Sequence, residues 1–423
     1  EFCPMMKFLF TLLLSIPLLA QKPFYAQFRY FHLETDNEKV LPDYGANALG
    51  VELGYTKNVG KHFKVDLSGS LSTSFLNSSN LASSRYEIGL FDQANTSNLD
   101  FLTRIEKASL TYQNKKMKVK LGRQVLNTPF INPQDGRMRP SAEGGIYAEW
   151  GPLSLGYLYE MAPRGTMGWS PVAESIGYFP VGVAIDGKKS TYAGHLRSAG
   201  MMMAGLDQKW KGISYKFHDL FVENLLQTAL ISAEFAHPIR GGKWVSGIQF
   251  IKQHSLSDNQ YTEKNTHASV ISLKTGLEYK RWNGSLNVTN ISAEGRYLMP
   301  REWGKDPFYT FMPRERNEGL GDVKAYVAKF SYAIPNWKMK INPSVGYFDL
   351  PSVTNFNLNK YGMPSYSQVN LEILIDASKI AKGLDFQFLL ANKTNQGDTM
   401  GNSKYIQNKV NMNSWNFVLN YRL

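Results

Sequence analysis

The last ten residues, Ser-Trp-Asn-Phe-Val-Leu-Asn-Tyr-Arg-Leu at positions 414–423, indicate the fold. Trp, Phe, Leu, Tyr and Leu occupy every second position, and Asn, Val, Asn and Arg lie between them. A period of two is that of a β-strand whose two faces meet different surroundings. At the end of a soluble domain such an aromatic strand would leave a sticky edge, whereas a closed barrel has no edge. The stretch therefore predicts a barrel whose last strand pairs with its first.

Charged residues on one face of other segments indicate what the two faces meet. Between residues 116 and 121, three lysines share one parity and Met, Val and Leu share the other, and residues 337–341 repeat the pattern. A lysine that faced lipid at the bilayer midplane would cost about 2–4 kcal/mol. The lysine faces must therefore meet water. The sequence predicts an all-β fold, a transmembrane antiparallel β-barrel with a wet and partly basic lumen.

The same alternation recurs along the whole chain. Short turns alternate with long loops, and both ends of the barrel fall on the short-turn side, as in outer-membrane barrels. About eighteen strands are predicted, with sixteen as the alternative, and either number leaves an aqueous channel. The predicted strands are 24–35, 47–57, 62–75, 104–113, 116–126, 146–150, 153–161, 203–210, 213–219, 225–236, 243–253, 267–280, 285–293, 323–333, 337–348, 367–378, 384–394 and 414–423.

The beginning of the chain has the features of a secretory signal. Lys7 precedes a short apolar run over residues 8–19, and Ala20 is a plausible cleavage site. We expect residues 1–20 to be upstream residues and a signal peptide, and residues 21–423 to be a single porin domain. An export signal together with a membrane barrel implies the outer membrane of a Gram-negative-type bacterium. The one cysteine, Cys3, precedes the predicted cleavage site, so no disulfide is expected in the mature chain.

The charge balance favours anionic solutes as partners. The chain has 47 Lys and Arg against 35 Asp and Glu, a formal net charge of +12. An exported chain without a Lys/Arg-rich tail is not expected to bind nucleic acid. A lumen for small anionic or zwitterionic solutes suits the charge better, and outer loops that contact lipopolysaccharide would account for part of it. Outer-membrane lipid and the barrel-assembly machinery are the other expected partners, and the choice between monomer and trimer stays open.

Motifs of other chemistries are missing from the sequence. The seven histidines have no HExxH spacing, and no GxSxG, Walker or dinucleotide-binding pattern occurs. We therefore expect no metal, no cofactor and no enzyme activity. Two alternatives from other classes stay open. One is an outer-membrane barrel enzyme, a phospholipase or protease, and the other is a secreted β-sandwich that binds carbohydrate or acts as an adhesin.

Four segments resemble the OprD family of substrate-specific outer-membrane porins. They are residues 120–140 (KLGRQVLNTPFINPQDGRMRP), 303–319 (WGKDPFYTFMPRERNEG), 358–366 (LNKYGMPSY) with 382–390 (KGLDFQFLL), and the C-terminal strand. The matches occur in the family's order over most of the chain. The resemblance implies an eighteen-stranded porin narrowed by inward-folded loops, with a basic track that guides carboxylate-bearing solutes such as amino acids, peptides or organic acids.

The resemblance and the residue pattern together give candidate site residues. The segments 120–140 and 303–319 would supply the constriction, although Arg123 shares the parity of the lipid face unless a bulge at Gly122 turns it inward. An alternative is that the arginines of residues 120–140 serve only to fold their loop. The constriction candidates are Arg123, Asp135, Arg137, Arg139, Arg301, Arg314, Arg316 and Glu318. The candidates for a basic track, chosen by lumen parity, are Lys64, Lys118, Lys120, Lys216, Lys274, Lys280, Lys338, Lys340 and Arg422.

Overall fold

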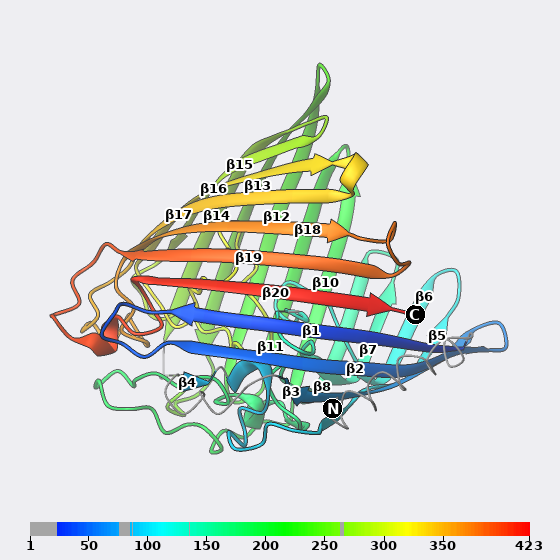
Figure 1. The fold of residues 1–423 in the computed structure, drawn as a ribbon, viewed down its shortest axis with the longest axis horizontal. Coiled ribbons are helices and arrows are strands. Elements are labelled where there is room, and N and C mark those ends of the chain that lie inside the picture. The colour runs from blue at the N-terminus through cyan, green and yellow to red at the C-terminus, as the bar shows by residue number, and fades with distance from the viewer. Residues whose placement is uncertain (1–22, 76–84, 87, 135, 263–265) are drawn as a thin grey trace, which may run out of the picture.

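The computed structural model describes residues 23–75, 85–86, 88–134, 136–262 and 266–423, and its strands form one closed antiparallel barrel (Figure 1). The barrel closes where the first strand pairs with the last, with Tyr30 opposite Leu419. Eighteen strands of the described residues make up the wall, which confirms the predicted fold, strand number and closure. The predicted signal segment, residues 1–20, lies outside the described residues.

The wall strands are long, and each agrees with a predicted segment to within a few residues. They are β1 (Phe24–Asp36), β2 (Tyr44–Val59), β3 (Phe63–Ser74), β5 (Leu102–Gln113), β6 (Met117–Gln124), β7 (Ala142–Trp150), β8 (Leu153–Ala162), β10 (Met201–Trp210), β11 (Ile213–Val222), β12 (Leu226–Ile239), β13 (Gly242–Ser255), β14 (His267–Tyr279), β15 (Trp282–Ile291), β16 (Val323–Ile334), β17 (Met339–Asp349), β18 (Tyr366–Asp376), β19 (Leu384–Asn395) and β20 (Met412–Arg422).

The remaining elements of the described residues are short. Two-residue strands, β4 (Arg85–Tyr86) and β9 (Ser170–Pro171), lie in long loops. The 3-10 turns are η2 (Ile88–Leu90), η3 (Ala173–Ser175), η4 (Pro335–Trp337) and η5 (Ser403–Tyr405). Among the described residues, none of the helical segments is long or apolar enough to span a bilayer.

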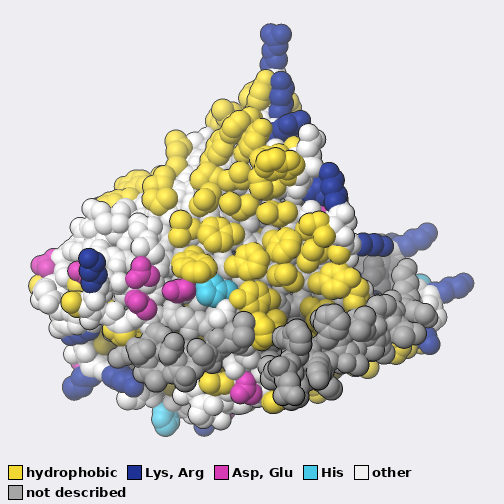
Figure 2. Space-filling view, in the orientation of Figure 1, with side chains coloured by type: hydrophobic (Ala, Val, Ile, Leu, Met, Phe, Trp, Pro, Cys, Tyr) yellow, Lys and Arg dark blue, Asp and Glu magenta, His cyan; other side chains and the backbone are white. Residues whose placement is uncertain are grey.

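The outer face of the barrel is apolar. Leu273 and Leu277 of β14, Leu286 of β15 and Val345 of β17 are all exposed, as are their outward-facing neighbours on most strands. Figure 2 shows hydrophobic side chains gathered over the strands on the face in view. A soluble protein rarely exposes an apolar patch larger than a few hundred Å². The outer face is therefore that of a transmembrane barrel, which is the architecture of outer-membrane proteins.

The lumen is filled at one end and open at the other. At the loop end of β14, the inward-facing Ala268, Val270 and Ser272 are buried. Toward the turn end, the inward-facing Lys274 is only half-buried and Glu278 is exposed. Long loops therefore occupy the loop-side part of the lumen, while the turn-side part is open to water.

The short turns carry a strong positive charge. The short turns on the side of the barrel where β1 begins and β20 ends contain no Asp or Glu, whereas the connections on the opposite side contain nearly equal numbers of acidic and basic residues. In Figure 2, Lys and Arg side chains stand at the tips of the barrel beyond the apolar surface. The excess charge thus lies largely at the turn rim. The turn cations are Lys61, Lys115, Lys116, Lys211, Arg240, Lys280, Arg281, Lys338, Lys379 and Lys382.

Candidate functional site

Three long loops fold into the barrel and interlock as a plug. They are residues 125–141 between β6 and β7, 163–200 between β8 and β10, and 292–322 between β15 and β16. Asn132 exchanges two hydrogen bonds with the backbone of Lys305, at 3.0 and 3.1 Å. The carboxylate of Glu302 accepts the backbone N–H groups of Gly177 and Phe179 at 2.8 and 3.0 Å. The three loops therefore hold one another in place.

The plug is also attached to the barrel wall. The hydroxyl of Tyr309 donates to Glu234 of β12 at 2.8 Å. The carbonyl of Pro313 accepts from Gln368 and Asn370 of β18 at 2.8 and 2.9 Å. Fixed attachments on two sides of the lumen give the plug a defined position, which a constriction requires. Burial raises the pKa of Asp306 in this plug to about 6, although nearby Arg316 opposes the shift.

A cavity of about 430 Å³ lies between the plug and the wall formed by β1 and β18–β20, and we call it the chamber. Phe179 and Phe311 contribute aromatic rings to its lining. Its carboxylates are Glu315 and Glu372, so cations outnumber acids by six to two. The cations that line it are Arg137, Arg164, Arg301, Lys305, Arg314 and Arg316.

The arginines of residues 301–316 are held by specific partners. Arg301 forms an ion pair with Glu318 at 3.2 Å and stacks on Tyr361, with its guanidinium carbon 4.2 Å from the ring centroid. Arg316 donates to the Gln134 side chain at 3.1 Å. Bound in this way, each guanidinium has a fixed position from which it can still offer N–H groups to a solute.

Four of the predicted constriction residues come together in the chamber, namely Arg137, Arg301, Arg314 and Arg316. Arg314 donates to the hydroxyl of Thr35 on β1 at 2.9 Å, so it bridges the plug and the wall. Glu318 is buried behind the chamber and acts on it through Arg301. Asp135 lies outside the described residues.

Arg139 does not line the chamber. It is 2% exposed, lies 3.5 Å from the carboxylate of Glu106 and donates to Ser72. Glu106 is also paired with Arg104 at 2.6 Å. For Arg139, these contacts favour the alternative that the arginine serves to fold its loop, which stays a prediction. Arg139 borders a smaller cavity, of about 290 Å³, beside Glu106 and Lys107.

The prediction that Arg123 lies in the constriction is wrong. The register of β6 runs through Gly122 without a shift toward either neighbouring strand, so no bulge turns Arg123 inward. Arg123 keeps the parity of the exposed Leu121, pairs with Glu160 at 3.0 Å and lies over Trp169, 4.5 Å from the ring centroid. The register shift occurs instead on the next hairpin, between Gly144 and Gly145 of β7.

The predicted basic track divides into lumen residues and turn residues. Lys274 reaches the plug, 5.7 Å from the ring centroid of Tyr309. Lys280 and Lys338 do not belong to the track, because both lie in turns with positive φ angles of 51° and 48°. Tight hairpin turns need residues in this left-handed conformation. Each lysine therefore belongs to its turn and not to a wall strand. The candidates on inward-facing positions are Lys64, Lys118, Lys120, Lys216, Lys274, Lys340 and Arg422.

Several lumen cations are paired, which lowers their combined field. Lys64 lies 3.0 Å from Asp66, and Lys118 lies 2.8 Å from Glu149. Arg422 pairs with Asp385 near the turn end. The lumen wall is therefore of mixed charge, and the strongest cluster of cations is the chamber itself.

Sequence reasoning missed Arg164 and Lys305. Arg164 donates to the backbone carbonyl of Gln134 at 3.2 Å, and the guanidinium carbon of Arg164 lies 5.4 Å from the ring centroid of Phe179. No periodicity marks residues 163–200, so nothing in the pattern distinguishes Arg164 from a solvated loop arginine. Lys305 lies within the segment 303–319 that indicated the constriction, and its positive charge was the only available signal.

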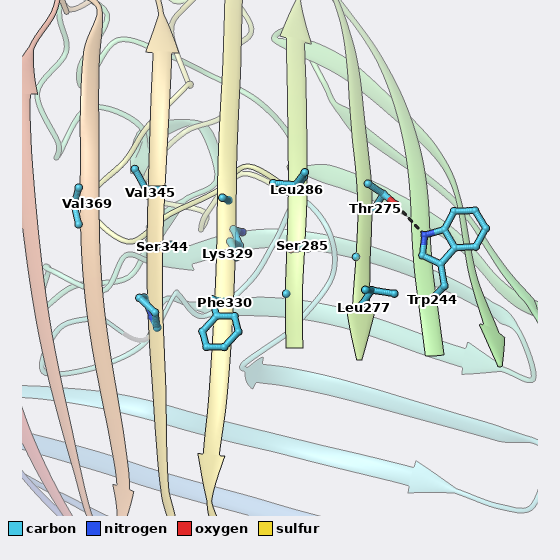
Figure 3. Close-up of a pocket in the computed structure, with 14 residues that line it drawn as sticks. Trp244, Thr275, Leu277, Ser285, Leu286, Lys329, Phe330, Ser344, Val345 and Val369 are labelled. Atoms are coloured by element: carbon cyan, nitrogen blue, oxygen red, sulfur yellow. Dashed lines mark hydrogen bonds between the residues drawn. The ribbon is translucent and has the colours of Figure 1, made fainter. Parts of the chain in front are cut away.

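A larger cavity, of about 750 Å³, opens on the outer face of the barrel and not in the lumen, and we call it the outer groove. It crosses the strands from β13 to β18, and Figure 3 shows Leu286, Phe330, Val345 and Val369 around it. Within the described residues there is no group of three or more His, Cys, Asp or Glu placed to hold a metal ion.

Comparisons with known proteins match this chain by structure and not by sequence. No family model and no curated protein matches the chain. The crystal structure of Pseudomonas aeruginosa OccK9 (OpdG) matches with a TM-score of 0.74 and 12% identity, over 95% of this chain and 97% of that one. Acinetobacter baumannii OccAB3 matches with a TM-score of 0.72 and 16% identity, over 95% and 98%. Pseudomonas aeruginosa OpdK with vanillate matches with a TM-score of 0.73 and 12% identity, over 95% and 98%.

These structures share the whole architecture with this chain. At such low identity the likeness concerns the fold alone. It confirms, at the level of the fold, the resemblance to the OprD family that the sequence segments indicated.

Proposed function

We propose that this chain, a transmembrane barrel with the fold of OprD-type porins, is an outer-membrane channel for small carboxylate-bearing solutes. The six cations that face two carboxylates in the chamber carry this proposal. A passage lined by one sign of charge within low-dielectric walls raises the local concentration of solutes of the opposite sign. The channel operates by diffusion, and its plug selects by charge.

The chemistry of the chamber favours a carboxylate over a simple halide ion. Arginine presents a planar fork of donors that matches the two oxygens of a carboxylate. Phe179 and Phe311 offer apolar contact to the rest of the solute. The similar structure of OpdK was solved with vanillate, itself a carboxylate. Organic acids, amino acids and peptides are the classes that fit these features.

The proposal is tested by solute uptake into liposomes. Replacing Arg137→Gln and Lys305→Gln together removes two chamber cations, and the Lys305 ammonium lies 5.5 Å from the ring centroid of Phe311. We expect passage of a small organic acid to fall about tenfold relative to the unsubstituted protein. Passage of an uncharged sugar of similar size should change little.

The matched control is Lys115→Gln with Lys116→Gln in the turn between β5 and β6. This pair removes the same charge outside the lumen, and its uptake rates should equal those of the unsubstituted protein. Equal losses for acid and sugar in the chamber variant would show that the chamber acts as a size filter only. A folded protein that admits neither solute would remove the channel function altogether.

A further inference from the structure

The outer groove lies next to the turn between β14 and β15. Outward-facing Gly284 of β15 and Ala328 of β16 are small and form its floor, while Leu286 and Val369, 64% and 53% exposed, form its sides (Figure 3). The backbone pairing between β16 and β17 is interrupted at this level. Phe330 lies opposite Pro343, and these two residues are not paired. Proline has no backbone N–H to donate. The groove therefore follows from local sequence and is a permanent feature of the wall.

The turn beside the groove is cationic. Lys280 and Arg281 form this turn, and both are exposed. Gly284 is three residues from Arg281 along β15, a distance of about 10 Å at the rise of a strand. The nearest acid in sequence, Glu278, has inward parity and faces the lumen. An anionic group at this turn would thus meet two cations and no carboxylate on the outer face.

Aromatic rings connect the turn to the groove. Trp282 packs on Phe330 with ring centroids 4.9 Å apart, and Lys280 lies 5.2 Å from the ring centroid of Tyr279. The indole N–H of Trp244 on β13 donates to the hydroxyl of Thr275 on β14 at 2.9 Å (Figure 3). Trp and Tyr occur at membrane–water interfaces, where headgroups meet acyl chains. The aromatic residues therefore mark the boundary between a charged and an apolar part of one binding surface.

We propose that the outer groove and the Lys280–Arg281 turn bind an anionic phospholipid, with an acyl chain in the groove and the phosphate at the turn. The lipid belongs to the leaflet on the turn side of the membrane. The assignment depends on the membrane placement in the proposed function but not on conduction through the chamber. Charge complementarity supports a phospholipid over a second copy of this chain, because a second copy would bring its own cationic rim to the same level.

The molecule offers a comparison site of the same kind without the cations. A second outer cavity of about 490 Å³ lies across β7, β8, β10 and β11 and is lined by Ala148, Leu155 and Met202, with the carboxylate residue Asp219 as well. Its adjoining turn, Gly151–Pro152, has no charge. Both sites offer apolar contact to an acyl chain, but only the outer groove offers partners for a phosphate.

The test is native mass spectrometry of the detergent-purified protein with phosphatidylglycerol or phosphatidylethanolamine. We expect the unsubstituted protein to retain phosphatidylglycerol in preference. Lys280→Gln with Arg281→Gln should weaken phosphatidylglycerol binding about tenfold, since each surface cation contributes to anionic lipid binding. Gly284→Leu should fill the groove and weaken binding of both lipids, because a Cβ there already lies 3.7 Å from the ring of Phe330.

Two control variants distinguish binding at this site from nonspecific lipid binding to the barrel. Lys115→Gln with Lys116→Gln removes equal charge nearly opposite on the barrel, and Ala148→Leu fills the second cavity. Both should leave the preference unchanged. Equal loss in Lys115→Gln with Lys116→Gln, no loss in Gly284→Leu, or a dimer in place of a lipid adduct would each overturn the proposal. Conductance of the same samples tests the channel separately, so lipid binding without conduction would refute only the proposed function.

Discussion

Arg137 and Arg139 lie two residues apart in one loop, yet their guanidinium groups meet opposite surroundings. Arg137 lines the chamber, whereas Arg139 is enclosed by Glu106, Ser72 and the side chain of Met167. The role of each arginine here depends on whether the loop directs its side chain toward the chamber or toward the barrel wall. The carboxylate of Glu106 pairs with both Arg139 and Arg104, so these three residues form a buried ion-pair cluster.

This difference predicts opposite effects of the same substitution. Arg139→Gln should destabilise the folded protein by about 3–5 kcal/mol, because it leaves a buried carboxylate with one partner fewer. Arg137→Gln should cost clearly less stability, because Arg137 lines the chamber. The measurement is the urea concentration at which the heat-resistant, fast-migrating band is lost from detergent gels. Equal midpoints for the two variants would contradict the structural role of Arg139.

At the scale of elements, the loop at residues 292–322 determines the passage. It carries four of the six chamber cations and is tied to both other inward loops. Trp303 is fully buried at this junction and donates to Ser175 of the loop at residues 163–200, at 3.1 Å. The plug thus packs as one body inside the barrel, and its buried apolar side chains share a hydrophobic cluster with the inner face of the wall.

Loosening this junction should widen the passage. Trp303→Ala removes a large buried side chain, at a cost of about 3–5 kcal/mol. Because the wall strands do not depend on Trp303, we expect the barrel to survive and single-channel conductance to rise, with larger current fluctuations. Phe308→Ala in the same loop is a milder comparison, since Phe308 is also buried. Unchanged conductance in folded Trp303→Ala would show that the plug is held by its wall contacts alone.

At the scale of the whole molecule, closure of the sheet decides stability. β20 pairs with both β1 and β19, so its loss would expose two long strand edges at once. Unpaired backbone groups in lipid are costly, and for this reason barrels in membranes are closed. The terminal strand, whose pattern first indicated the fold, is therefore a structural necessity.

Removing residues 412–423 should abolish the compact barrel. The assay is the shift in gel mobility on heating in detergent, which we expect for the full chain and not for the truncated one. Deleting residues 397–404, in the loop between β19 and β20, also shortens the chain but does not open the sheet. That second variant should still show the shift. A heat-modifiable truncated protein would mean that β1 and β19 can pair directly.

The sequence by itself determined the wall of this protein. Alternation of apolar and polar residues is a local property, so strand positions, their number and the two solvents they face follow from the chain alone. The strand predicted at 146–150 begins earlier in the structure, at Ala142. The prediction missed these first residues because the glycines at 144 and 145 interrupt the alternation of apolar and polar side chains. The cations of the turn rim are visible in the sequence, but they could be recognised as one positive rim only once the strand boundaries showed which connections are short turns.

Only the tertiary structure decided what the charges do. The inward loops have no period, and their positions result from contacts between segments more than a hundred residues apart, such as Asn132 with Lys305. Such contacts separated Arg137 from Arg139, placed Glu318 behind Arg301 and brought Arg164 to the chamber. Periodicity reports only the direction of a side chain from its own strand, whereas a site depends on which distant groups meet there.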